Sequence, residues 1–107
     1  MLDIYPFILE TITVLRPLAE RIARADADLG RQLKRAQASI ALNVAEGAYS
    51  RGRNRQVRYH TALGSARETL ACLEVAFALG HVGALNDELV GRFNRIIGTL
   101  VRLSGGR

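Results

Sequence analysis

The sequence has little of several residues that point to particular protein classes. Its 107 residues include one cysteine, Cys72, two prolines and no tryptophan. A single cysteine excludes a disulfide framework within the chain, which favours a reducing compartment. No stretch approaches the roughly 18 uncharged apolar residues that span a membrane. The N-terminus also lacks a basic segment followed by a long apolar run. We therefore expect a cytoplasmic protein with no membrane partner.

Residues that carry catalysis or hold cofactors are equally scarce. The glycines are scattered and no lysine follows them, so no phosphate-cradling loop is predicted. His60 and His81 lie far apart, and neither has a second His, Cys or carboxylate at metal-ligand spacing. Cys72 lies within an apolar segment, where cysteine packs as a small hydrophobic residue. We predict no catalytic residue, no metal site and no cofactor, and hence a protein that is not an enzyme.

Helix-forming residues are abundant, because alanine and leucine occur 15 times each. Apolar residues recur at three- and four-residue steps in four segments, which predicts four amphipathic helices. Their expected ranges are about residues 2–24, 28–48, 55–79 and 85–103. Pro17 should bend the first helix because it removes one backbone hydrogen bond. Gly47 is a candidate stop for the second helix.

Four helices of about 20 residues with short connections predict an all-α protein, an antiparallel up-down-up-down four-helix bundle. By length, the chain forms one domain over residues 1–107. The residues expected to face the core are Ile4, Ile8, Ile12 (with Thr11), Leu15, Ala19 and Ile22; Leu29, Leu33, Ala36, Ile40 and Val44; Tyr59, Leu63, Ala66, Leu70, Leu73 and Phe77; and Leu85, Leu89, Phe93, Ile96, Leu100 and Leu103.

Further apolar residues lie away from these faces. They are Phe7 and Leu18 in the first helix, and Val90, Ile97 and Val101 in the fourth. A helix that is apolar on more than one side is buried on more than one side, and a monomer would expose a sizeable patch. We therefore expect a stable oligomer.

Positive charge is concentrated in the middle of the chain. The net charge is +5, and all but one of the 15 basic residues are arginine. Residues 31–67 hold eight basic residues and a single acid, Glu46. The connection between the second and third helices should gather its arginines at one end of the molecule, which is typical of a polyanion binder. The predicted nucleic-acid-binding residues are Arg31, Lys34, Arg35, Arg51, Arg53, Arg55 and Arg58.

Two tyrosines flank this basic connection. Tyr49 and Tyr59 could stack on unpaired bases, although Tyr59 also fits the core face of the third helix. The alternative is that the basic connection is a solvated loop, or that it pairs with acidic groups on a neighbouring protein.

A polar row on the second helix, formed by Ser39, Asn43 and Glu46, allows two interpretations. It could be a polar site, or it could satisfy hydrogen bonds to a neighbouring helix or subunit. We favour the second, because buried polar groups must be paired. The glycine of the pair Gly64-Ser65 costs a helix roughly 1 kcal/mol. This cost predicts that another helix backbone comes close there.

Three segments together resemble the signature of a known family. They are Gln32 to Ile40, Asn43-Val44-Ala45-Glu46-Gly47, and Ala62-Leu63-Gly64-Ser65 with Glu68. The family comprises four-helix-bundle proteins encoded in intervening sequences of bacterial 23S ribosomal RNA genes. It includes the accessory variability determinant of diversity-generating retroelements. The resemblance covers residues 29–80 closely. The chain departs from the family pattern at Ala41, where a proline is common, in a first helix without tryptophan, and in the absence of an acid from residues 53–58.

The resemblance implies a barrel-like homopentamer. For the retroelement relatives it also implies binding to a reverse transcriptase and to nucleic acid through basic surfaces. The signature positions, which we interpret as structural, are Ser39, Asn43, Glu46, Gly47, Gly64, Ser65 and Glu68.

The leading hypothesis is a non-enzymatic, oligomeric, RNA-associated or nucleic-acid-binding accessory protein that uses the arginine-rich junction between the second and third helices. RNA or DNA would be its partner. The alternative is a protein–protein interaction scaffold, for example for a reverse transcriptase, without direct nucleic-acid binding. A third hypothesis is an enzyme whose polar row on the second helix lines a cleft between subunits.

Overall fold

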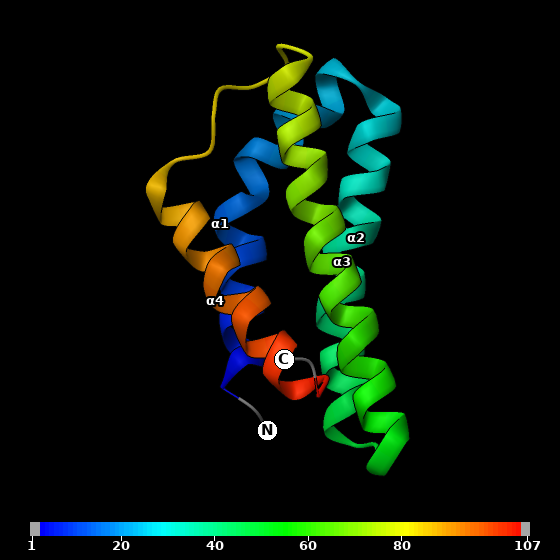
Figure 1. Ribbon diagram of the computed structural model, residues 1–107. Helices are drawn as coiled ribbons and strands as arrows, with labels where there is room; N and C mark the ends of the chain where they lie inside the picture. Colours follow the sequence, from blue (N-terminus) through cyan, green and yellow to red (C-terminus); the bar gives the residue numbers. More distant parts are fainter. Residues whose placement is uncertain (1–2, 106–107) are drawn as a thin grey trace.

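The computed structural model describes residues 3–105, which form an all-α fold of four helices with no strand in that range (Figure 1). The helices are α1 (Ile4–Ala25), α2 (Ala27–Ala48), α3 (Gly52–Ala78) and α4 (Asp87–Leu103). Followed by its colours in Figure 1, the chain reverses direction at each connection between helices. The expected helix start at residue 2, and residues 1–2 and 106–107 of the expected domain, lie outside the described residues.

Side-chain caps define the starts of two helices. Asp26 is the one residue between α1 and α2. Its carboxylate accepts a hydrogen bond of 3.0 Å from the Leu29 amide. The Asn86 side chain accepts one of 2.9 Å from the Leu89 amide, so α4 begins after Asn86, two residues later than predicted. Such caps satisfy amides that have no partner within the helix. Helix α1 continues through Pro17 to Ala25.

The buried apolar residues form two clusters, one toward each end of the helices. The first contains Ile4, Ile8, Ile40, Ala41, Val44, Tyr59, Ala62, Leu63, Ala66, Ile96 and Leu100. The second contains Leu15, Ile22, Leu29, Leu33, Cys72, Leu73, Ala76, Val82, Leu89 and Phe93. All five residues expected to form the core face of α2 are buried. The helical periodicity therefore located most of the core correctly.

The predicted core face of α3 is wrong at its C-terminal end. Phe77 is 53% exposed, and Ala76 is fully buried in its place. At its start α3 is buried among residues of the first cluster, and further along it is buried by a different set, the second cluster. Tyr59, Ala62, Ala66, Thr69, Leu73 and Ala76 are all buried at a regular three–four spacing, so the buried seam passes through Thr69 and Ala76 where Leu70 and Phe77 were predicted. Four predicted core residues on the helices, Ile12, Ala19, Leu70 and Leu103, are half-buried rather than buried, and so is Leu85 in the α3–α4 connection.

The apolar residues predicted to remain outside the core are also placed differently. Phe7, Leu18, Ile97 and Val101 pack against the two clusters, and only Val90 is clearly exposed, at 40%. The larger exposed apolar side chains lie elsewhere, mainly on α2 and α3. They are Leu42, Tyr49, Val57, Val75, Phe77 and Leu79, and α1 adds Leu9. Any apolar contact with another molecule therefore falls mainly on α2 and α3 rather than on α1 and α4.

Gly47 is not the stop of α2, because the helix continues through Ala48 and Gly47 has no positive φ. It is instead a point of close approach between α2 and α3. A Cβ atom at this position would lie 2.5 Å from Cε1 of the buried Tyr59 ring. Gly64, by contrast, has open space around it, so the backbone contact predicted there is not made by any residue from 3 to 105.

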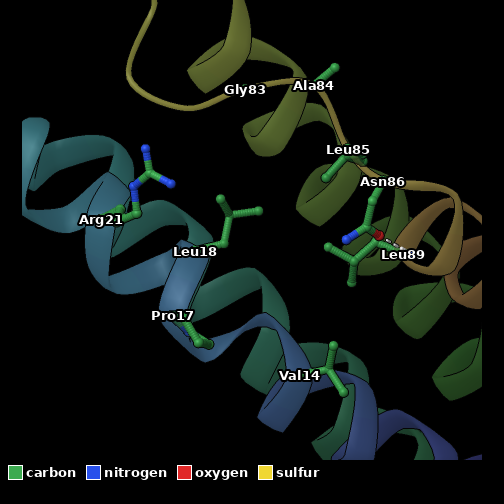
Figure 2. Close-up of a pocket in the computed structure, with 9 residues that line it drawn as sticks. All are labelled: Val14, Pro17, Leu18, Arg21, Gly83, Ala84, Leu85, Asn86 and Leu89. Atoms are coloured by element: carbon green, nitrogen blue, oxygen red, sulfur yellow. Dashed lines mark hydrogen bonds between the residues drawn. The ribbon is translucent and has the colours of Figure 1, made fainter.

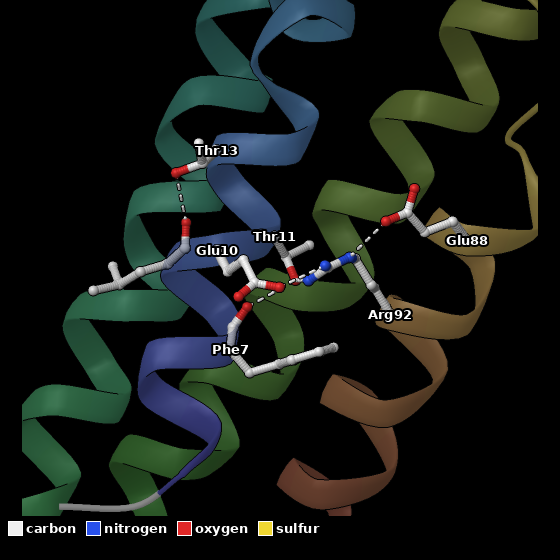
Figure 3. A network of polar contacts seen from close by, with 7 residues as sticks. Phe7, Glu10, Thr11, Thr13, Glu88 and Arg92 are labelled. Atoms are coloured by element: carbon white, nitrogen blue, oxygen red, sulfur yellow. Dashed lines mark hydrogen bonds and ion pairs between the residues drawn. The ribbon is translucent and has the colours of Figure 1, made fainter.

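Helices α1 and α4 are joined by a polar network centred on Arg92 (Figure 3). The Arg92 guanidinium donates to Glu10 Oε1 at 2.6 Å and to Thr11 Oγ1 at 3.1 Å. Its Nε lies 3.6 Å from Glu88 Oε2, and its Cζ lies 4.9 Å from the centroid of the Phe7 ring. The hydrogen bond with Glu10 is the main cause that raises the pKa of Arg92 above its ordinary value. Arg92 is therefore a permanent cation between the two helices.

Candidate nucleic-acid interface

The connection between α2 and α3 is a tight turn built on backbone hydrogen bonds. The amide of Tyr49 donates to the carbonyl of Glu46 at 3.2 Å, and the amide of Ser50 donates to that of Gly47 at 3.1 Å. The Ser50 hydroxyl also donates to the Glu46 carbonyl, at 2.8 Å. Gly52 follows with φ +57°, a conformation that favours glycine. Helix α3 therefore begins three residues earlier than predicted.

Four residues at this turn, Arg51, Arg53, Arg55 and Arg58, are here called the junction arginines. All four are exposed. Arg51 is the last residue of the turn, and the other three lie in the first two turns of α3. The Arg55 Nε donates to the Ser50 carbonyl at 2.9 Å, which leaves the rest of its guanidinium available. None of the four makes an ion pair with a described residue. The turn therefore presents four uncompensated cations at one end of α3.

The start of α3 adds to this positive field. Arg51, at the N-cap position, makes no capping hydrogen bond through its side chain, and the first turn contains no acidic residue. The unpaired amides at a helix start carry a partial positive charge that favours anions. In α2 and α4, by contrast, Asp26 and Asn86 occupy this position and cap the first turn. The junction is thus suited to bind an anion such as phosphate.

The two tyrosines beside the junction have different environments. Tyr59 is 2% exposed and packs against Gly47, so it belongs to the core. Tyr49 is 83% exposed at the end of α2. Only Tyr49 is therefore positioned to stack on an unpaired base.

The other predicted contacts, Arg31, Lys34 and Arg35, lie near the start of α2 and are here called the α2 basic group. All three are exposed, and together with Ala38 they line a shallow hollow. Arg31 forms an ion pair with Asp28 in the preceding turn, and both side chains are largely exposed. At 1.5 Å per residue, the length of α2 separates this group from the junction by about 25 Å. The seven predicted residues therefore form two groups and not one patch.

A further hollow lies between α1 and the α3–α4 connection (Figure 2). Figure 2 shows Val14, Pro17 and Leu18 on one side and Leu85 and Leu89 on the other. Arg21 is the one charged residue among those that line it. The hollow therefore lacks the paired titratable groups that general acid–base chemistry requires.

Two polar contacts of this protein were not found from sequence. The Arg92 network joins residues 82 positions apart, and only the four-residue spacing of Glu88 and Arg92 could have suggested part of it. His81 Nε2 lies 3.3 Å from Asp26 Oδ2, 55 residues away. Within residues 3–105, no three His, Cys, Asp or Glu side chains are grouped as they would be in a metal site. None of the described helices is both long and apolar enough to cross a membrane.

Residues 10–102 match the model of the family described as 23S rRNA-intervening sequence protein. The chain belongs to this family. The match spans most of α1, all of α2 and α3, and α4 up to its penultimate residue, so it includes both basic groups. No curated protein and no solved structure matches the chain significantly.

Several signature positions of this 23S rRNA-intervening sequence protein are tied together between α2 and α3. The Ser65 hydroxyl donates to Ser39 Oγ at 2.7 Å, and Asn43 Nδ2 donates to both the carbonyl and the hydroxyl oxygen of Ser39, at 2.9 and 3.0 Å. Ser39 thus has a partner on a neighbouring helix, as the favoured interpretation of the polar row requires, whereas Asn43 bonds within α2. Glu46 is exposed and takes no part in this network through its carboxylate. Gly64 and Glu68 are exposed as well.

Cys72 is buried, at 6% exposure. Burial raises the pKa of its thiol, and the nearby Glu68 carboxylate raises it further. A thiol reacts as its thiolate, which burial disfavours. Cys72 therefore has the properties of a core residue and not those of a nucleophile.

Proposed function

We propose that this protein is a cytoplasmic, non-enzymatic, oligomeric accessory protein that binds RNA or DNA through the junction arginines. The observation that carries the proposal is the group of four exposed arginines, free of ion pairs with described residues, around the uncapped start of α3. Arginine has a planar fork of donors that matches two phosphate oxygens at once. Phosphate contacts of this kind hold a nucleic acid without reading its sequence.

The energetic basis is the release of condensed counterions. Each phosphate neutralised on a duplex changes the slope of log K against log salt by about −0.9. Four junction contacts would therefore give a slope of about −3 to −4. The amides at the start of α3 add a fixed favourable field toward the same anion. The family description, which refers to an intervening sequence of 23S rRNA, is consistent with an RNA-associated role.

We also propose that copies of the protein assemble through the exposed face of α3. Val57, Gly64, Val75 and Leu79 recur along α3 at helical spacing and are all exposed. A second copy of the chain would cover these apolar residues, which share their side of α3 with the exposed Glu68, and Gly64 would allow its backbone to approach closely. The protomer would be an antiparallel up-down-up-down bundle, and the family resemblance favours five copies in a barrel. A monomeric mass at micromolar concentration in solution would contradict this part of the proposal.

The main test measures binding to a labelled structured RNA and to a duplex DNA across about 50 to 300 mM salt. The wild-type protein is compared with a variant in which Arg51, Arg53, Arg55 and Arg58 are changed to alanine. We expect the variant to bind at least tenfold more weakly at low salt and to show a slope smaller by about 3. Circular dichroism verifies that each protein remains helical.

The matched control changes Arg16, Arg21, Arg24 and Arg102 to alanine, which removes the same charge from elsewhere on the surface. It should bind nearly as well as the wild-type protein, because the junction arginines remain. If the two variants lose the same affinity, the effect is one of net charge and the proposed interface is wrong. If the wild-type protein binds neither nucleic acid, the alternative of a protein-interaction scaffold takes its place, with a partner such as a reverse transcriptase.

A further inference from the structure

The distance between the two basic groups indicates which form of nucleic acid this protein accepts. Arg31, Arg35 and Tyr49 share the outer side of α2, since they are separated by whole helical turns, and all are exposed. The 18 residues from Arg31 to Tyr49 span about 27 Å of helix. The junction arginines lie immediately beyond Tyr49. Cations therefore lie at one end of the outer side of α2 and just beyond its other end, in the turn and the start of α3, with a long interval between them.

That interval carries no cation. Its outward-facing residues Ala38 and Leu42 are exposed, Leu42 to 64%, and Glu46 places a negative charge near its end. A single strand that binds without sequence preference needs a continuous basic groove and aromatic side chains along its path. This interval offers neither, and Glu46 would repel the phosphates of a flexible chain. A rigid polyanion, however, can bridge the interval without being held within it.

A double helix has the required stiffness and repeat. Its persistence length is about 50 nm, so it stays straight over the length of α2. One helical turn of duplex DNA is about 34–36 Å. The two groups lie about 25 Å apart along α2, and their long arginine side chains extend the span that they can reach. The hollow lined by Arg31, Lys34, Arg35 and Ala38 provides a second phosphate position at the far end. The ion pair of Arg31 with Asp28 is exposed and therefore weak, so Arg31 remains available to a phosphate.

We propose that the protein binds double-stranded nucleic acid lengthwise along α2, with the junction arginines and the α2 basic group contacting phosphates about one helical turn apart. The inference rests on the proposed function, because it takes the junction as the first of two contact points. It adds the class of ligand, a duplex and not a single strand. For duplex DNA, at roughly 3.4 Å per pair, it also sets a minimum length of about 10 base pairs.

The test is the dependence of affinity on ligand length. Duplex RNAs and DNAs of about 6 to 20 base pairs, and single strands of the same lengths, are bound at fixed salt. For the wild-type protein we expect duplex affinity to rise about tenfold or more as the length passes about 10 base pairs, beyond the increase due to added binding registers. Single strands should show no such step, and parallel RNA and DNA series show whether both duplexes are accepted.

A variant with Arg31, Lys34 and Arg35 changed to alanine should bind short duplexes normally and lose the step. Its salt slope on long duplexes should fall by roughly 2 to 3. The matched control changes Arg16, Arg21 and Arg24 to alanine, removes the same charge and should keep the step. Circular dichroism again verifies that both variants are folded.

The outcomes separate the two proposals. If the α2 variant keeps the length step, or if single strands bind as tightly as duplexes, the lengthwise duplex is overturned while the junction remains a binding site. A length step that arises from two junctions in one oligomer would also persist in the α2 variant, and would overturn it in the same way. If the junction variant binds every ligand as well as the wild-type protein, the proposed function itself fails.

Discussion

The α2–α3 pair and the α1–α4 pair are held together in opposite ways. Helices α2 and α3 share the most extensive contact of any two helices, and they approach closely where Gly47 meets the Tyr59 ring and where Ser39 meets Ser65. Helices α1 and α4 share much less contact, and the long side chain of Arg92 spans the gap between them. Figure 3 shows the Arg92 side chain reaching from α4 to α1. Helix α4 also packs against α3, more extensively than against α1.

The difference shows which changes each pair can tolerate. A close approach depends on the absence of atoms, so it is sensitive to added volume and insensitive to salt or pH. A long charged side chain that joins two helices can adjust to small shifts between them, but the contact depends on its charged partners. Two basic groups must keep a fixed separation along α2 if the protein binds duplexes as proposed, and the rigid pair is the one that contains them.

The largest effect should follow from Gly47→Val. The new side chain would overlap the Tyr59 ring, because even a Cβ atom would lie 2.5 Å from Cε1. Overpacking of this kind costs about 3 kcal/mol. We expect the free energy of unfolding, measured by urea denaturation, to fall by about that amount.

Gly91→Val is the matched control, since Gly91 lies within α4 with open space around it. Its unfolding free energy should change by less than about 0.5 kcal/mol. Equal losses in the two variants would mean that the close approach at Gly47 does not hold α2 against α3.

An intermediate effect should follow from Arg92→Met, which keeps the apolar stem and removes the charge. The variant loses the hydrogen bonds to Glu10 and Thr11 and the contact with the Phe7 ring. Because Glu10 is largely exposed and regains water, we expect a loss of about 1–2 kcal/mol in the unfolding free energy. Unlike the loss at Gly47, part of it should disappear in high salt.

Arg95→Met is its control. Arg95 also lies over the Phe7 ring, with its Cζ 4.1 Å from the centroid, but forms no ion pair with a described residue. Its loss should be about 0.5–1 kcal/mol, the value of an exposed cation–π contact. If Arg95→Met proves as costly as Arg92→Met, the ring contact and not the carboxylates would be what joins α1 to α4.

The smallest effect is expected from acid. The hydrogen bond from the Leu29 amide, and then the contact with His81, lower the pKa of Asp26 below its ordinary value of 3.8, against a smaller opposing effect of burial. A carboxyl group with a lowered folded-state pKa stabilises the fold above its unfolded-state pKa. That contribution is lost as the pH falls from about 3.8 through the lower value. Thermal melts of wild type and Asp26→Asn should therefore differ at neutral pH and converge in stronger acid, and a constant difference would contradict this.

The sequence predicted those parts of the fold that repeat along the chain. The four helices and the buried face of α2 follow from apolar spacing alone, because a helix that buries one side must repeat its apolar residues. The same spacing predicted where the junction arginines would gather. It missed the start of α3, because Arg53 and Arg55 lie in its first turn and carry no apolar pattern.

Contacts between distant residues could not be predicted in this way. The exposure of Phe77 depends on which helices surround the end of α3, and the ion pair between Arg92 and Glu10 joins the two ends of the chain. Gly64 shows a third limit, because helix propensity identified an unusual position without revealing that the space around it is open within the chain. Each of these depends on how the helices are placed relative to one another, which local patterns do not encode.

The burial of Cys72 has a practical consequence for site-specific chemistry. Maleimide dyes and nitroxide spin labels react with thiolates, and this thiol is both shielded and slow to ionise. A cysteine introduced at an exposed site such as Ala38 or Gln56 would therefore be the one position labelled in the folded protein, with the native cysteine left in place. Probes at these two sites would report separately from the middle of α2 and from the start of α3.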